Sequence, residues 1–145
     1  MEIITQENEK LLLKDLCARL PYGVKCCIYN FVEDTIRIKE DILWSVQGDN
    51  VLTLKSYVEK GEVYTYHQIK PYLFPLSSMT DEDHATYSKI WEDTGKTAYL
   101  EGCHHLICTI KAYKAANDYL LSKHYDTDGL IPKGLAIDAT GLNIY

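Results

Sequence analysis

A histidine and a cysteine four residues apart, His104 and Cys108, are the first residues of this chain whose types and spacing suggest chemistry. At that spacing on a helix, two side chains share one face and could supply two metal ligands. His84 or Cys103 would have to complete the set, because no second spaced pair accompanies them. We favour a buried thiol beside a partly exposed imidazole, and the sequence predicts neither a metal nor another cofactor.

The cysteines and histidines of this region could also form a thiolate–imidazole pair, and Ser77-Ser78 could be paired with His84. Neither pairing falls in a catalytic motif such as a strained strand-to-helix elbow. A cysteine near a histidine arises by chance in many globular chains, so the proximity alone does not identify a nucleophile. The sequence therefore leans against an enzyme and keeps a small enzyme with a Cys/His site as an alternative.

The segment Asp126-x-Asp128-Gly129 is similar to the opening of a calcium loop. Such a loop needs a further oxygen ligand before its glycine and a bidentate glutamate six positions after it, where this chain has Leu135. We predict a helix-ending turn instead. In such a turn Asp126 accepts hydrogen bonds from nearby amides and Gly129 takes a positive φ.

Tyrosine is the strongest compositional bias, with 12 tyrosines against 2 phenylalanines. A tyrosine ring has an apolar body and a polar tip, which suits a binding surface and equally suits the half-wet face of a small sheet. Trp44, Tyr57, Tyr64 and Tyr66 are predicted to form an exposed aromatic face that binds a protein partner. If these rings alternate with inward valine and isoleucine, they belong instead to the core and its rim.

The same aromatic face offers a second hypothesis, the binding of single-stranded nucleic acid. Its rings would stack on bases while Lys25, Arg37, Lys39 and Lys55 met phosphates. The chain has 15 basic and 21 acidic residues, a formal charge of −6, which disfavours nucleic acid as a partner.

Length and composition are those of one globular domain: 145 residues, 46% hydrophobic and 25% charged. The N-terminus lacks the pattern of a signal peptide, and no apolar stretch approaches the roughly 20 residues that span a bilayer. The five cysteines are odd in number and form no CxxC pair, so we expect reduced, mostly buried thiols. These features predict a cytoplasmic protein that does not enter a membrane.

Periodicity divides residues 1–76 into a helix and a β unit. A helix is predicted from Gln6 to Leu20, capped by Thr5, and a β unit of four or five short antiparallel strands over residues 24–76, with a bulge near Glu40-Asp41. Pro71 and Pro75 mark the end of that unit as an edge or covering segment. The predicted apolar stripe of the first helix comprises Leu13, Leu16, Cys17 and Leu20.

Residues 77–145 are predicted to be helical with an extended tail. Thr80 caps a helix that runs to about Asp93 and stops at Gly95, and a second helix covers Lys111–Lys123. Thr97–Ile110 stays open between helix and strand. The second helix is predicted from residues at near-helical spacing: Cys103, Leu106, Ile107, Ile110, Tyr113, Asn117, Leu120, Leu121 and His124.

The chain resembles small uncharacterised proteins that gut anaerobic bacteria and their phages and prophages encode. The resemblance rests on three blocks: LLLKDLCARLPYGVKC at Leu11–Cys26, IKPYLFPLSSMT at Ile69–Thr80 and DGLIPKGLAIDATGLNIY at Asp128–Tyr145. They cover about a third of the chain. The resemblance implies a phage or mobile-element context and carries no catalytic residues.

Together these patterns predict a single α+β domain over residues 1–145. It comprises an N-terminal helix (1–23), a small antiparallel sheet or SH3-like barrel (24–76), and a helical part with an extended docking tail (77–145). The function they favour is that of a noncatalytic protein-binding accessory module. Its partner and oligomeric state stay open, because the sequence identifies neither.

Overall fold

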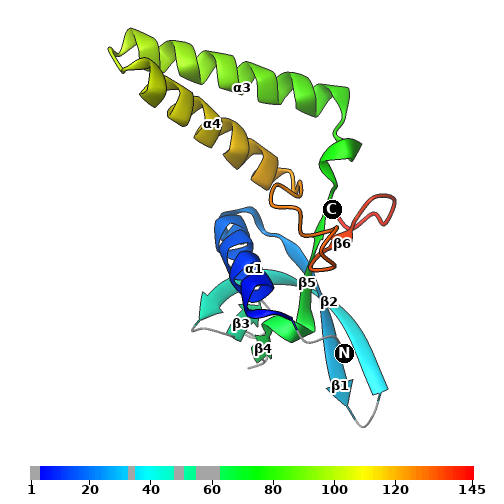
Figure 1. The fold of residues 1–145 in the computed structure, drawn as a ribbon. Helices are drawn as coiled ribbons and strands as arrows, with labels where there is room; N and C mark the ends of the chain where they lie inside the picture. The colour runs from blue at the N-terminus through cyan, green and yellow to red at the C-terminus, as the bar shows by residue number, and fades with distance from the viewer. Residues whose placement is uncertain (1–3, 33–34, 48–50, 55–62) are drawn as a thin grey trace.

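The computed structural model describes residues 4–32, 35–47, 51–54 and 63–145 (Figure 1). The fold is α+β: an N-terminal helix, a small sheet, and two C-terminal helices. Figure 1 shows the two C-terminal helices, α3 and α4, side by side and extending away from the sheet as an arm. Lys55 and Tyr57 lie outside the described residues.

The first helix, α1, spans Gln6–Arg19, close to its predicted bounds. Thr5 Oγ1 accepts a hydrogen bond from the Asn8 amide at 3.2 Å, which confirms the predicted cap. A 3₁₀ turn over Leu20–Tyr22 then ends at Gly23, whose φ of 65° is left-handed. The predicted apolar stripe is partly wrong, because Cys17 is exposed and the fully buried face carries Leu12, Asp15, Leu16 and Arg19.

Within the described residues, the sheet has six strands in the order β4-β3-β2-β1-β5-β6. All neighbouring pairs are antiparallel except β5 and β6, which are parallel. Among the described residues β4 and β6 stand at opposite ends of this order, and the SH3-like barrel stays a prediction. The strands are β1 Lys25–Val32, β2 Thr35–Gln47, β3 Val51–Leu54, β4 Val63–Thr65, β5 Ile69–Leu73 and β6 Ile137–Asp138.

Two predictions about the strands need correction. The irregularity in β2 lies between Leu43 and Ser45, further along the strand than the predicted bulge. Strand β5 was expected at an edge because it contains Pro71, yet it lies between β1 and β6. The proline is tolerated because β6 is only two residues long and pairs with Tyr72 and Leu73, beyond the proline.

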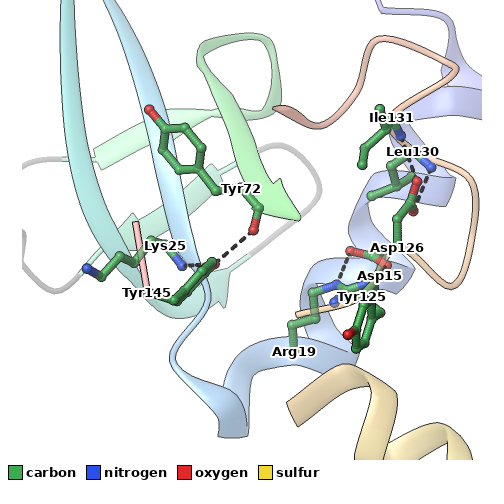
Figure 2. Close-up of polar contacts among 9 residues, drawn as sticks. All are labelled: Asp15, Arg19, Lys25, Tyr72, Tyr125, Asp126, Leu130, Ile131 and Tyr145. Atoms are coloured by element: carbon green, nitrogen blue, oxygen red, sulfur yellow. Dashed lines mark hydrogen bonds and ion pairs between the residues drawn. The ribbon is translucent and has the colours of Figure 1, made fainter. Parts of the chain in front are cut away.

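The core lies between α1, the sheet and the C-terminal tail. From the tail, Leu130, Leu135 and Ala136 join the buried cluster, and Ala139 donates its amide to the Leu73 carbonyl at 2.8 Å. Asp126 forms the local turn that the sequence predicted. Its carboxylate accepts hydrogen bonds from the amides of Leu130 and Ile131 at 2.8 and 2.9 Å (Figure 2). Gly129 there has the expected positive φ of 71°.

A buried ion pair joins α1 to the start of that tail (Figure 2). The Arg19 Nε and Nη2 atoms donate to the two carboxylate oxygens of Asp15 at 2.7 and 3.0 Å, and Nη2 also donates to the Tyr125 carbonyl at 2.7 Å. Both charged side chains are 0% exposed. Burial raises the pKa of Asp15, and the guanidinium opposes that rise.

The C-terminal helices differ from their predicted bounds. Helix α3 spans Asp81–Leu100 and passes through Gly95, where a stop was expected, and α4 spans His105–Ser122. Thr80 caps α3 as predicted, accepting from the Asp83 amide at 3.1 Å. Residues 97–110 contain no strand. The helix continues past Gly95 because that glycine packs against α4, and the chain reverses only at Gly102, where φ is 82°.

Candidate functional site

The predicted aromatic face of the β unit is not formed by the tyrosines assigned to it. Trp44 on β2 is 57% exposed, but Tyr64 and Tyr66 are 5% and 0% exposed and belong to the core. Tyr66 begins a 3₁₀ turn over Tyr66–Gln68, which interrupts the strict alternation of a strand. The rival interpretation, that these rings are core and rim, therefore describes Tyr64 and Tyr66.

Two of the basic residues named for nucleic acid, Lys25 and Lys39, lie beside acidic side chains. Lys25 Nζ donates to the Ile144 carbonyl at 2.6 Å and lies 3.5 Å from Glu40, while Lys39 Nζ lies 4.0 Å from Asp41. Arg37 is on β2 as well. Two of the four named basic residues thus lie beside carboxylates, and two of the rings assigned to base stacking are buried.

His104 and Cys108 do not share a helical face. His104 precedes α4 as its N-cap, with Nδ1 accepting from the Leu106 amide at 3.3 Å. Cys108 is buried, and its thiol donates to the Cys103 carbonyl at 3.4 Å. Within the described parts of the chain, no group of three or more His, Cys, Asp or Glu side chains could hold a metal ion.

The pairing of Ser77-Ser78 with His84 that the sequence offered has no catalytic arrangement in the described structure. Ser78 lies in a 3₁₀ turn, Leu76–Ser78, and its hydroxyl donates to the Pro75 carbonyl at 2.7 Å. His84 is exposed on α3. The hydroxyl proton of Ser78 is directed to a backbone carbonyl, so the contact does nothing to activate the oxygen as a nucleophile.

A hollow of about 500 Å³ at the base of the arm brings together polar groups that the sequence did not connect. Asp83 accepts from the hydroxyls of Tyr119 at 2.8 Å and Tyr125 at 2.6 Å. The hydrogen bond from Tyr125 is the main cause of a lowered Asp83 pKa. Both tyrosine hydroxyls therefore donate to the Asp83 carboxylate, and these two hydrogen bonds join α3 to the end of α4.

His124 lines the same hollow in a left-handed conformation, with φ of 65°. Its amide bonds to the Leu121 carbonyl and the Tyr125 amide bonds to the Leu120 carbonyl, the pair of bonds that closes a helix C-terminus. The imidazole stacks on Tyr145, with ring centroids 3.8 Å apart. Burial lowers the pKa of His124 to about 4, so the ring is neutral at pH 7.

Tyr145 continues this contact to the sheet. Its hydroxyl accepts from the Lys25 amide at 2.9 Å and donates to the Tyr72 carbonyl at 2.8 Å, as Figure 2 shows. The stacked pair of His124 and Tyr145 thus fastens the end of α4, the C-terminus and two strands to one another. These groups position the arm relative to the sheet.

The arm itself is held together by small side chains. On α4 the buried positions Cys108, Ala112 and Ala116 recur every four residues and so form one narrow stripe. A Cβ placed on Gly95 of α3 would lie 3.9 Å from Ala112 Cβ, ordinary van der Waals contact. Because these side chains are so short, they fill little of the space beside the helix contact.

A groove of about 570 Å³ runs along the outer half of the arm. From α3 it is lined by Trp91, Gly95 and Tyr99, and from α4 by His105 and Ala112, among others. The lining is mostly apolar, so the groove suits an apolar occupant better than a charged one.

Large apolar side chains stand exposed around this groove. They belong to what we call the arm patch: Tyr99, Leu100, Leu106, Ile107, Ile110 and Tyr113, between 43% and 84% exposed. Leu106, Ile110 and Tyr113 recur at i, i+4 and i+7 and form one ridge along α4. The ring of Tyr113 meets Trp91 edge-on at 6.3 Å, which places the ridge beside the groove.

The sequence predicted the second helix from a set that includes the ridge residues, and it did not identify the ridge as a candidate site. A signal was present in the sequence, because Cys108, Ala112 and Ala116 form a second stripe on α4. A helix that is apolar on two faces needs two apolar neighbours. In the described structure α3 covers one of these faces, and the ridge is left open.

No known protein family, curated protein or solved structure matches this chain. Among the described residues, no helix is long and apolar enough to cross a membrane. The candidate site therefore rests on the geometry of the arm.

Proposed function

We propose that this protein is a noncatalytic protein-binding accessory module and that the α3–α4 arm carries the contact. The observation behind the proposal is the arm patch. Exposed apolar patches beyond a few hundred Å² are uncommon on proteins that act alone, and they mark sites of association. The resemblance to proteins of gut anaerobes and their phages supplies the proposed setting, a cytoplasmic accessory of a phage or mobile element.

Three features of the arm support binding to a protein. The patch combines aliphatic side chains with two tyrosines, a composition enriched at protein interfaces. The stretch from Leu106 to Ile110 carries no charged residue. Charged groups stand around it, at Glu101, Lys111 and Lys114, as in an interface with an apolar centre and a polar rim.

The noncatalytic part of the proposal is supported by where the reactive side chains lie. Cys108 faces the helix contact, His104 caps a helix, and Asp83 already accepts two hydroxyls. Among the described residues, Cys108, His104 and Asp83 do not converge on one hollow, and such convergence is what general acid–base or nucleophilic chemistry by these groups would require.

The test is capture of proteins from a lysate of the native host, with and without nuclease treatment, using three forms of the tagged chain. The arm variant, Leu106→Glu with Ile110→Glu, places two carboxylates on the ridge. The control variant, Ile36→Glu with Ile38→Glu, makes the same change on β2, where both side chains are similarly exposed. Any protein bound through the arm should be retained by wild type and the control and lost with the arm variant.

Two results would contradict the proposal. One is retention of the same proteins by the arm variant and by wild type, which would place the contact elsewhere. The other is recovery of material that disappears with nuclease treatment, which would favour the nucleic-acid alternative.

A further inference from the structure

We infer that the arm patch binds a second copy of this chain, so that two α3–α4 arms form a four-helix bundle about a two-fold axis. This inference rests on the proposed function and names the partner of the same surface. Helical hairpins commonly pair in this way, because each brings two helices with one apolar face left over.

The shape of the arm suits a partner identical to itself. The ridge of Leu106, Ile110 and Tyr113 stands beside the groove that Trp91 and Gly95 line. A two-fold interface brings the same surface together twice, so a surface that holds both a ridge and a hollow can complement itself. The ridge of each arm would then enter the groove of the other, and a single two-fold rotation would form both contacts.

The exposed area is close to what a stable dimer needs. With about 150–250 Å² for a fully exposed large side chain, the six residues of the arm patch leave roughly 700 Å² open per copy. A standard protein interface buries about 800 Å² on each partner. The arm patch would supply most of that area, and the remainder would come from the polar rim.

The charge of the arm also favours a second copy. Two copies of a chain with charge −6 repel one another over most of their surface. Residues 92–114 carry three acidic and three basic side chains, so their net charge is 3 − 3 = 0. The acidic ones are Glu92, Asp93 and Glu101, and the basic ones are Lys96, Lys111 and Lys114. The outer arm is therefore a place where two copies can meet without net repulsion.

The arrangement of the fold leaves room for this pairing. Figure 1 shows the arm leading away from the sheet, with the reversal between α3 and α4 at its far end. The patch lies on that outer half, at residues 99–113. Two arms can overlap there while the two sheets stay apart.

The experiment is the solution mass of the purified protein, measured by light scattering after size exclusion over a range of concentrations. Wild type and the Ile36→Glu, Ile38→Glu control should both reach twice the mass of the chain. The Leu106→Glu, Ile110→Glu variant should dissociate at least roughly 30-fold more readily, the effect of losing one interface hot spot. Far-UV circular dichroism checks that both variants keep the helix content of wild type.

A second measurement needs no variant. Hydroxyl-radical labelling of Leu106, Ile110 and Tyr113 should fall as the wild-type protein is concentrated, while labelling of Trp44 stays constant. Equal labelling of the ridge at all concentrations would overturn the inference.

The outcomes separate the two proposals. A monomeric wild type whose arm still captures a host protein would overturn the second-copy inference and leave the protein-binding function standing. A monomeric wild type with no arm-dependent capture would overturn both. A dimer that survives the arm substitutions would place the contact between copies elsewhere and overturn the inference.

Discussion

Replacing Arg19 with methionine should destabilise this protein more than any surface change. The side chain is 0% exposed, donates two hydrogen bonds to Asp15 and a third to the Tyr125 carbonyl, and so joins α1 to the C-terminal segment. Methionine keeps much of the apolar stem and removes the charge. The carboxylate of Asp15 would then be buried with no cation beside it.

The expected cost is about 3–5 kcal/mol, the usual effect of removing one partner of a buried ion pair. A domain of this kind is stable by about 5–15 kcal/mol, so the variant stays folded but marginal. At about 2–4 °C per kcal/mol, the midpoint of thermal unfolding should fall by roughly 10 °C. Urea unfolding followed by circular dichroism measures the free energy directly.

The matched control is the double variant Asp15→Leu with Arg19→Met, which removes both charges. It should be more stable than Arg19→Met by about 2 kcal/mol or more, because no unpaired charge stays buried. Some loss relative to wild type should remain, since the Tyr125 carbonyl loses its donor. A cost below about 1 kcal/mol for Arg19→Met, or a double variant less stable than the single, would refute the reasoning.

The same variant has a pH signature. Burial raises the pKa of Asp15, and losing the guanidinium raises it further. A carboxyl whose folded-state pKa is raised favours the folded protein at low pH, and that contribution is lost as the pH rises through the folded pKa. The stability gap between Arg19→Met and wild type should therefore narrow as the pH falls from 7 toward about 4, the unfolded value.

Two further predictions concern the arm and its base. Gly95→Ala should stabilise the protein by about 0.5–1 kcal/mol in urea unfolding, because alanine is the better helix former. The new Cβ would lie 3.9 Å from Ala112 Cβ, an ordinary contact. A loss of stability would show that the helices meet more closely than described. His124→Asn keeps a residue that tolerates the left-handed backbone and should cost about 1 kcal/mol at pH 7 through the lost stacking on Tyr145. The pKa of His124 falls to about 4 on folding. The stability that the neutral His124 ring contributes is therefore complete above its unfolded pKa near 6.5, and it is lost as the pH drops to about 4. The asparagine variant should lose less stability over that range, and parallel pH curves for the two proteins would contradict this assignment.

Features set by a few neighbouring residues could be predicted from the sequence. Thr5 and Thr80 cap their helices by accepting from the amide three residues on, and Asp126 accepts from amides four and five residues on. In each case donor and acceptor lie within one turn of chain, so the local residue types suffice. The α+β class was predictable for the same reason, because the change in hydrophobic period occurs along the chain.

Interpretation from the sequence failed where the answer depended on a distant partner. Gly95 is a good helix stop in isolation, yet α3 passes through it because packing against α4, where Gly95 lies opposite Ala112, outweighs the low helix propensity of glycine. Tyr66 has the pattern of an outward strand residue, yet its ring is buried in the core shared with α1. A residue's own type determines neither contact.

The division for the candidate site follows the same physics. The sequence by itself determined that the second half of the chain holds two helical segments, a surplus of apolar side chains and no catalytic motif. Only the tertiary structure decided which of those side chains are covered: Cys108 and Ala112 pack against α3, while Leu106 and Ile110 stay exposed. Exposure is a property of the packed molecule, because burying one face of a helix requires an apolar surface that another part of the chain must bring to it.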